Sequence, residues 1–111
     1  PGRAAGRRLP DPRHGEARLG ERLTPLRHTL LVLDDSPAGA DFVADLRAAG
    51  HPCVHIGPDW PDPDGALRAS LGGARLAIVR PDRIVAAAAT TLDPELLARY
   101  ARALGVAPAA L

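Results

Sequence analysis

The sequence predicts one α/β domain, built on a four-stranded mixed sheet with helices on both faces. The chain has 111 residues, which suffices to bury a core but allows one domain at most. Short apolar runs of strand length alternate with segments whose apolar residues recur at helical spacing. Two of these runs are separated only by a short turn, which indicates an antiparallel hairpin. The predicted order is β-α-β-α-β-β-α.

The first half of this order is a strand–helix–strand unit. The run at Thr29–Leu33 is uninterrupted and apolar, as suits a central strand covered on both faces. Ser36 or Asp35 can cap the helix that follows, and Pro37 fits its first turn. The second strand is Cys53–Ile56, and a right-handed crossover makes it parallel to the first.

The second half is a loop, a short helix, a hairpin and a last helix. After a loop rich in Pro and Asp, the expected elements are helical turns at Ala66–Leu71, strands at Arg75–Val79 and Ile84–Ala88 around a turn at Pro81–Arg83, and a helix from Asp93 to Gly105. Residues 29–105 then form a thioredoxin-like domain. Residues 1–28 are expected to be a lead-in or linker from a preceding domain, with at most a short strand or turn near Ala17–Leu23. Residues 106–111 are expected to be a loose tail.

Composition excludes several classes of function. The net charge of +1 with balanced signs argues against binding to nucleic acid or to a membrane surface. No apolar run is long enough to span a membrane and no signal-peptide pattern is present, so we expect a cytoplasmic location. The absence of Lys removes amine nucleophiles, and the absence of Met predicts a processed product or a piece of a longer chain.

Two groups of side chains suggest metal sites only weakly. His51, Cys53 and His55 alternate and would share one face of a strand, but structural zinc needs a fourth ligand. Asp62, Asp64 and Gly65, with Asp59 nearby, show the Asp-x-Asp-Gly spacing of some calcium loops, but the closing Glu of such a loop is missing. We therefore expect ordinary sheet residues and a solvated turn, and no metal.

The pair Asp34-Asp35 follows a strand and resembles the acidic pair of phosphoacceptor receiver domains, with Asp82 at a plausible distance for the phosphoacceptor. A receiver needs a late Lys and five βα units, so carboxylates at a helix N-terminus are the better interpretation. A thioredoxin carries its active cysteines at this same place. In this sequence the corresponding residues are Asp34 to Pro37, and none of them is a cysteine. Because thiol–disulfide exchange needs a thiolate at this position, that reaction is excluded.

No catalytic or cofactor-binding residue is predicted. The serines, Ser36 and Ser70, lack any motif that would place a His beside them, and there is no Gly-x-Gly-x-x-Gly or P-loop. A basic lead-in, Arg3, Arg7, Arg8 and Arg13, has no aromatic neighbours for stacking on bases. We interpret it as a solvated linker or as a segment that pairs with acidic groups on a neighbouring domain.

One stretch carries a family resemblance. Residues 75–86 read RLAIVRPDRIVA and resemble the "LVRPDGYVAWR" hairpin near the end of FAD-dependent aromatic hydroxylases, the class A flavoprotein monooxygenases that act on phenols and polyketide aromatics. Residues 5–10 resemble the "PGxRxP" segment that opens their C-terminal domain. Residues 23–31 resemble the lead into its "(F/H)TLL" strand, and residues 62–72 suit the segment before the hairpin. The resemblance covers nearly the whole chain in the same order.

The resemblance implies a C-terminal thioredoxin-like domain without redox cysteines. In the parent enzyme NAD(P)H would reduce FAD, and one oxygen atom of O2 would go to an aromatic ring. The domain itself would bind neither cofactor and would pack against the FAD and substrate domains or a second subunit. Arg80, Pro81 and Asp82 would form its structural hairpin motif.

The sequence departs from the family at two places. Arg83 replaces the turn Gly, and Ala87-Ala88 replace Trp-Arg at the end of the hairpin. A positive φ at Arg83 would cost about 1 kcal/mol relative to Gly, so a different turn type is expected. The domain interface is expected to be smaller or altered.

Two functions follow. The first is a non-catalytic domain that serves packing and, as an open alternative, dimerisation in a flavin-dependent ring hydroxylase. The second is a free-standing, redox-inactive thioredoxin-like or receiver-like module that binds a partner protein.

Overall fold

The computed structural model describes residues 5–111 and contains a four-stranded sheet in the spatial order β4-β3-β5-β6. The strands are β3 (Thr29–Val32), β4 (Cys53–His55), β5 (Leu76–Val79) and β6 (Val85–Ala89). β3 and β4 are parallel, whereas β5 is antiparallel to both β3 and β6. The predicted α/β class and mixed sheet are confirmed, and the arrangement is that of a thioredoxin-like fold.

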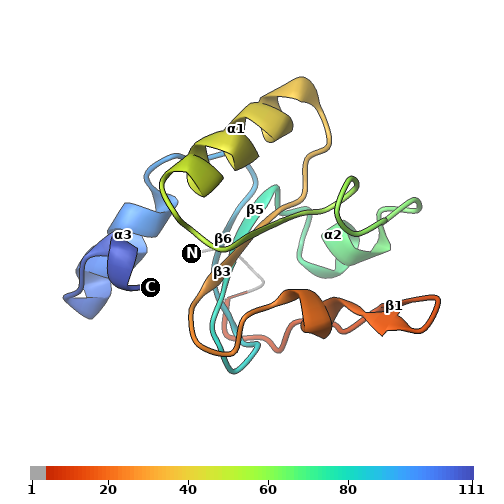
Figure 1. Ribbon diagram of the computed structural model, residues 1–111, viewed down its shortest axis with the longest axis horizontal. Coiled ribbons are helices and arrows are strands. Elements are labelled where there is room, and N and C mark those ends of the chain that lie inside the picture. The colour runs from red at the N-terminus through yellow and green to blue at the C-terminus, as the bar shows by residue number, and fades with distance from the viewer. Residues whose placement is uncertain (1–4) are drawn as a thin grey trace.

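The sheet separates two hydrophobic clusters, because successive side chains of a strand point to opposite faces. Leu30 and Val32 pack with the helices α1 (Pro37–Ala48) and α3 (Leu96–Leu104). Leu31 and Leu33 face the other way and pack with α2 (Ala66–Ser70), with the buried Trp60 and with the N-terminal segment. Figure 1 shows α1 above the sheet and the N-terminal segment, in red and orange, below it.

The N-terminal segment contributes to the core. It contains a small two-stranded sheet of β1 (Arg13–His14) and β2 (Ala17–Arg18), followed by the 3-10 helix η1 (Leu19–Arg22). Leu9 and Leu19 are buried in the cluster below the sheet, at 5% and 0% exposure. The interpretation of residues 1–28 as a lead-in did not anticipate these contacts.

The prediction of a loose tail is wrong. Residues 108–110 form the 3-10 helix η2 (Pro108–Ala110), and Leu111 is buried in the α1–α3 cluster. The guanidinium of Arg27 donates from Nε to the Leu111 carbonyl at 3.1 Å and from Nη2 to the Ala109 carbonyl at 3.4 Å. The Leu111 carbonyl also accepts the His28 N–H at 3.1 Å. Burial of Leu111 and these hydrogen bonds together hold the segment in place.

Several element boundaries differ from prediction by one to three residues, and two of these differences have a clear local cause. β6 begins at Val85, after Ile84, because Ile84 closes the hairpin turn through its carbonyl bond to the Arg80 N–H. α3 begins at Leu96, and the Asp93 carboxylate accepts a bond from the Glu95 N–H at 2.9 Å just before it. Asp93 therefore orders the backbone about one turn before Leu96, the first residue of the helix.

Candidate functional site

The carboxyl end of β3 is where a thioredoxin would carry its cysteines, and here it forms a helix cap. Ser36 Oγ accepts the Gly39 N–H at 3.4 Å, as predicted, and Asp34 Oδ1 accepts the Ser36 N–H at 2.9 Å. The bonds from Ser36 lower the pKa of Asp34, and Arg75, at 3.8 Å, acts in the same direction. Gly39 lies so close to the Asp34 carbonyl that any Cβ there would overlap it. These groups are satisfied structurally, and none is poised as a nucleophile.

Burial disfavours the thiolate form of Cys53 near neutral pH. It lies half-buried on β4 against the α1–α3 cluster. Desolvation raises the pKa of its thiol from 9.0 to about 11, although Arg47 acts in the opposite direction. Disulfide exchange proceeds through the thiolate, so this thiol is chemically quiet.

The alternating histidines serve the sheet and its loops. His55 is buried, and its Nε2 lies 2.7 Å from the Asp34 carbonyl oxygen. The backbone N–H of His51 bonds to the Leu46 carbonyl behind α1, before β4 begins. Within residues 5–111 no group of three His, Cys, Asp or Glu side chains could hold a metal ion.

The receiver-like acidic residues lie at opposite ends of the sheet. Asp34 follows the carboxyl end of β3, next to the start of β5, where Val32 pairs with Leu76. Asp82 follows the end of β5, beyond the pair Thr29–Val79 at the other end of β3. The pairing register therefore separates the predicted acidic residues, and no phosphoacceptor cluster forms.

The aspartates of the loop have separate structural roles. Asp59 accepts bonds from the Arg47 guanidinium at 2.5 Å and from the His55 N–H at 2.8 Å. Asp62 accepts the N–H groups of Leu67 and Arg68 at 3.1 and 3.3 Å, and so caps α2. The sequence interpretation missed this cap, because the acceptor lies five residues before its first donor rather than two or three.

The cleft beside this loop has an acidic lining. It has a volume of about 340 Å³ and lies at the carboxyl ends of β3 and β4, between Leu33, Ile56 and the start of α2. Among the described residues that line it, Asp35, Asp62 and Asp64 contribute carboxylates and Arg68 contributes a cation. A dinucleotide cofactor needs N–H groups or cations around its diphosphate. This cleft is therefore poorly suited to hold FAD or NAD(P)H.

The hairpin residues singled out by the family resemblance form the β5–β6 turn. The Arg83 N–H bonds to the Arg80 carbonyl at 2.8 Å, and the Asp82 carboxylate accepts the Ile84 N–H at 3.2 Å and the Arg80 guanidinium. Desolvation acts to raise the pKa of Asp82, whereas these hydrogen bonds act to lower it. The net effect is a pKa below the usual value. Pro81 supplies the fixed φ of the turn.

Arg83 adopts a left-handed backbone conformation. Its φ is 69°, so the expectation that the turn would avoid a positive φ at this residue is wrong. The guanidinium reaches back to the N-terminal segment, where Nη2 lies 3.4 Å from the Gly20 carbonyl oxygen and Nη1 lies 3.8 Å from Asp11. Gly20 leaves room for it, because a Cβ there would meet this guanidinium at 2.5 Å.

The hairpin end of the sheet also holds a pair that the sequence did not reveal. His28 Nε2 lies 3.0 Å from the Tyr100 hydroxyl, and the two rings are in tilted contact at 5.4 Å. Desolvation, followed by the charge of Arg80, lowers the pKa of His28, and desolvation raises that of Tyr100. The residues come from segments 72 positions apart, so no local signal could have found the pair.

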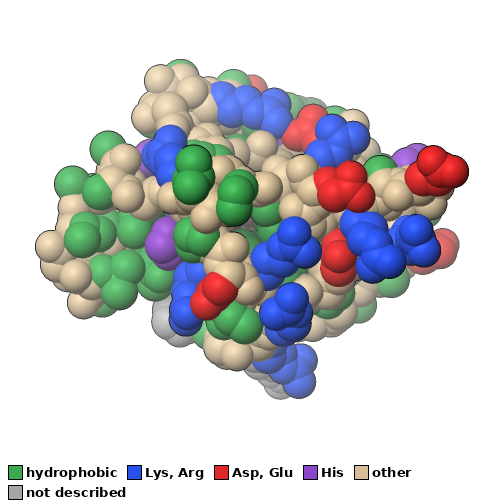
Figure 2. All heavy atoms as spheres, turned by 60° about the horizontal axis from the view of Figure 1, so that its bottom comes forward, with side chains coloured by type: hydrophobic (Ala, Val, Ile, Leu, Met, Phe, Trp, Pro, Cys, Tyr) green, Lys and Arg blue, Asp and Glu red, His purple; other side chains and the backbone are tan. Residues whose placement is uncertain are grey.

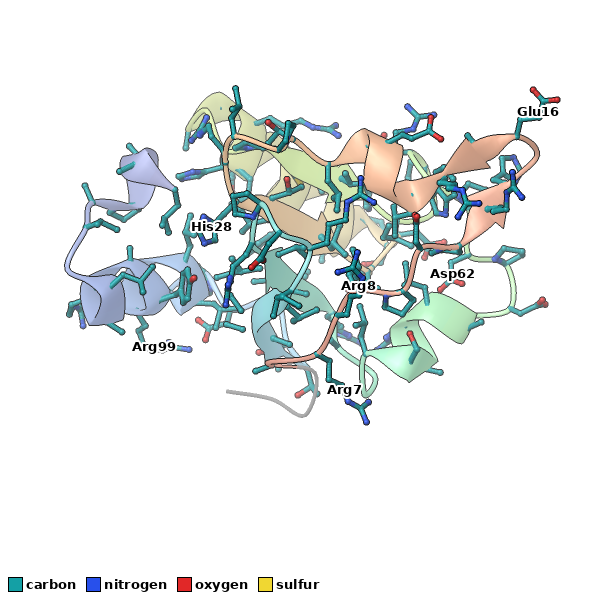
Figure 3. The ribbon with its side chains drawn as sticks, turned by 90° about the horizontal axis from the view of Figure 1, so that it is seen from below. Arg7, Arg8, Glu16, His28, Asp62 and Arg99 are labelled. Atoms are coloured by element: carbon teal, nitrogen blue, oxygen red, sulfur yellow. The ribbon has the colours of Figure 1, made fainter. Side chains whose placement is uncertain are left out.

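The basic lead-in runs beside the hairpin. Arg8 forms an isolated antiparallel bridge with Ile84, and the Arg7 carbonyl accepts the Val85 N–H at 2.8 Å. Figure 3 shows Arg7 and Arg8 on this segment. Arg13 lies exposed on β1, whereas Arg3 lies outside the described residues.

The fold is thioredoxin-like, and at the β3–α1 junction a Ser36 cap stands where a thioredoxin carries its cysteines. No family model matches the chain, and no curated protein matches it. Among solved structures it is similar to aklavinone-11 hydroxylase, determined as a ternary complex with FAD and aklavinone, with a TM-score of 0.60 and 27% sequence identity. The similarity covers 78% of this chain but 18% of the hydroxylase chain, so the sequence matches a fragment of an FAD-dependent hydroxylase. No helix within residues 5–111 is long and apolar enough to cross a membrane.

Proposed function

We propose that this chain is the thioredoxin-like domain of an FAD- and NAD(P)H-dependent aromatic ring hydroxylase, and that it serves packing rather than catalysis. The observation that carries the proposal is the match to aklavinone-11 hydroxylase in both fold and sequence. The reaction centre then lies in the part of the parent enzyme that this chain does not match. FAD bound there would supply the chemistry of O2 activation. The partners of this domain would be the preceding FAD and substrate domains and, as a further option, a second subunit.

The chemistry of the described residues supports a non-catalytic role. The β3–α1 junction carries a serine cap in place of cysteines, and burial suppresses ionisation of the Cys53 thiol. The cleft at the carboxyl ends of the parallel strands presents carboxylates, which repel a diphosphate. The hairpin motif Arg80, Pro81 and Asp82 holds the β5–β6 turn and its bonds are internal.

The test compares the 111-residue chain with a polypeptide that also includes its upstream coding sequence. We expect the short chain to be colourless, to leave FAD fluorescence unchanged on titration and not to oxidise NADPH. The longer polypeptide should be yellow and should oxidise NAD(P)H faster when an aromatic substrate is added. Its upstream part should encode a Gly-x-Gly-x-x-Gly motif near the start, as flavin-binding folds do.

Two results would contradict the proposal. Flavin binding or NADPH oxidation by the short chain would place the reaction centre within it. Absence of any flavin-binding region upstream would instead favour a free-standing module that recognises a partner protein. An insulin-reduction assay serves as a control for residual thiol chemistry, and we expect no activity above buffer.

A further inference from the structure

Three backbone carbonyls accept hydrogen bonds from the guanidinium of Arg27, just before β3. Its Nε and Nη2 donate to the carbonyls of Leu111 and Ala109, and its Nη1 donates to the Gly50 carbonyl at 3.1 Å. The backbone N–H of the next residue, His28, bonds to the same Leu111 carbonyl. One fixed cation thus joins the start of β3, the turn after α1 and the C-terminal unit formed by α3, η2 and Leu111.

Two histidines flank this guanidinium. His28 follows Arg27 in the chain, is partly buried, and has its Nε2 3.0 Å from the hydroxyl of Tyr100 on α3. His51 follows Gly50, is also partly buried, and lines a cleft together with side chains of α1, α3 and η2. Figure 2 shows histidine side chains, in purple, and arginine side chains, in blue, next to the hydrophobic side chains at the left of the molecule, where α3 and η2 lie in Figure 1. Both imidazoles therefore lie where the C-terminal unit meets the rest of the fold.

The surroundings of His28 disfavour a proton on its imidazole. Tyr100 contacts it from α3, Arg80 and Asp82 face it from the β5–β6 turn, and Arg27 precedes it in the chain. Desolvation has the largest effect and lowers the pKa of His28, the charge of Arg80 acts in the same direction, and the charge of Asp82 acts against both. Because the Asp82 carboxylate is already paired with Arg80, an imidazolium at His28 would gain little from it.

His51 has similar surroundings. Desolvation, followed by the charge of Arg27, lowers the pKa of His51. Asp45 of α1 lines the same cleft, but this residue is exposed, so water and salt screen its charge. A proton on either histidine therefore adds a cation to a partly buried region that already contains a fixed guanidinium.

We propose that Arg27, His28 and His51 form an acid-sensitive latch that holds the C-terminal unit against the sheet. Near neutral pH both imidazoles are uncharged and the unit is docked. In acid the imidazoles take up protons, the added charges repel the arginines beside them, and the unit opens locally so that water can solvate the imidazolium groups. Opening exposes Leu97 and Leu111, which are buried in the docked state.

The sign of the pH dependence follows from the two histidines. In the docked state both pKa values lie below the ordinary value of 6.5, which the opened unit would restore. The opened state therefore binds protons more readily than the docked state. The stabilisation of the docked unit is fully present above pH 6.5 and is lost as the pH falls from 6.5 towards the docked pKa values.

Amide hydrogen exchange of the 111-residue chain at about pH 7.5 and about pH 5.5 tests the proposal. Protection factors are compared, since they divide out the intrinsic pH dependence of exchange. We expect those of α3 to fall at least about threefold in acid, because opening takes up protons, and those of β5 to fall less. The terminal carboxylate of this polypeptide stays ionised over this range and contributes no change.

Variants assign the effect to the latch. Glutamine stays neutral at both pH values and retains hydrogen-bonding groups, so H28Q/H51Q should abolish the acid-induced fall in α3. H14Q serves as the matched control, because His14 lies exposed on β1 and contacts Trp60 instead of the C-terminal unit. The H14Q variant should keep the full wild-type response.

Three results would overturn the proposal: no fall in wild type, an equal fall in α3 and β5, or a fall that persists in H28Q/H51Q. If the double variant is unstable at neutral pH, an NMR titration of the wild-type imidazoles decides instead. Values of the pKa below 6.5 for both His28 and His51 would support the latch, and values at or above 6.5 would contradict it. None of these measurements involves flavin, so the latch and the proposed function can fail separately.

Discussion

Arg83 shows how one residue can keep a backbone geometry that its side chain disfavours. A φ of 69° costs a residue with a Cβ roughly 1 kcal/mol relative to Gly. The contacts of its guanidinium with the Gly20 carbonyl and with Asp11 join the hairpin to the N-terminal segment. These contacts are partly exposed and therefore weak, so they offset only part of the backbone cost.

Two substitutions separate these effects. R83G and R83A both lose the guanidinium, but only R83G also relieves the backbone. We expect R83G to be more stable than R83A by about 1 kcal/mol in urea unfolding. Equal stability of the two variants would show that the turn relaxes to a negative φ when the Arg contacts are lost.

The raised pKa of the Cys53 thiol predicts that both its reactivity and the stability of the fold depend on pH. The folded pKa of about 11 lies above the unfolded value of 9.0, so the folded state holds the proton more tightly. The resulting stabilisation is fully present below pH 9 and is lost as the pH rises towards 11. We expect alkylation by iodoacetamide at pH 8 to be roughly a hundredfold slower in the folded chain than in urea.

The C53A variant provides the control for the stability measurement. Its unfolding free energy should fall less steeply than that of wild type between pH 9 and pH 11. Identical slopes for the two proteins would mean that Cys53 titrates normally in the folded state.

At the scale of elements, α2 depends on a cap from outside its own turn. The helix Ala66–Ser70 is short, and Gly65 before it adopts a positive φ and offers no side chain. Asp62 supplies both carboxylate oxygens to the free N–H groups of Leu67 and Arg68. Because short helices are marginal alone, this carboxylate and the burial of Leu67 hold the element.

Removal of the cap should therefore be measurable. We expect D62A to lower the free energy of unfolding by about 1 kcal/mol and to increase amide exchange in residues 66–70. D64A changes a neighbouring exposed aspartate for which no hydrogen bond is found, and it should stay within about 0.5 kcal/mol of wild type. A D62A variant as stable as D64A would contradict the assignment of the cap.

At the scale of the whole molecule, the N-terminal segment closes one face of the sheet. Leu9 and Leu19 pack in the same cluster as Leu31 and Trp60, although they precede the predicted domain boundary at residue 29. The cluster on this side would lose part of its cover without them. The thioredoxin-like core and this segment therefore form one packed body.

A pair of leucine truncations tests this integration. L19A removes a side chain with 0% exposure and should cost about 2–5 kcal/mol. L26A removes one with 85% exposure from the same segment and should cost little. If unfolding in urea gave the two variants the same stability, residues 1–28 would behave as a linker.

The sequence by itself determined the α/β class, the order of the seven core elements and the start of α1, with Ser36 as its cap and Pro37 in its first turn. These features depend on local periodicity and on neighbouring residues. It also indicated the hydroxylase resemblance that the structural match supports at the level of a fragment. The docking of Leu19 and Leu111, the contact between His28 and Tyr100, and the separation of Asp34 from Asp82 were decided only by the tertiary structure. Each depends on strand register or on contacts between residues far apart in the chain, and no local pattern encodes those distances.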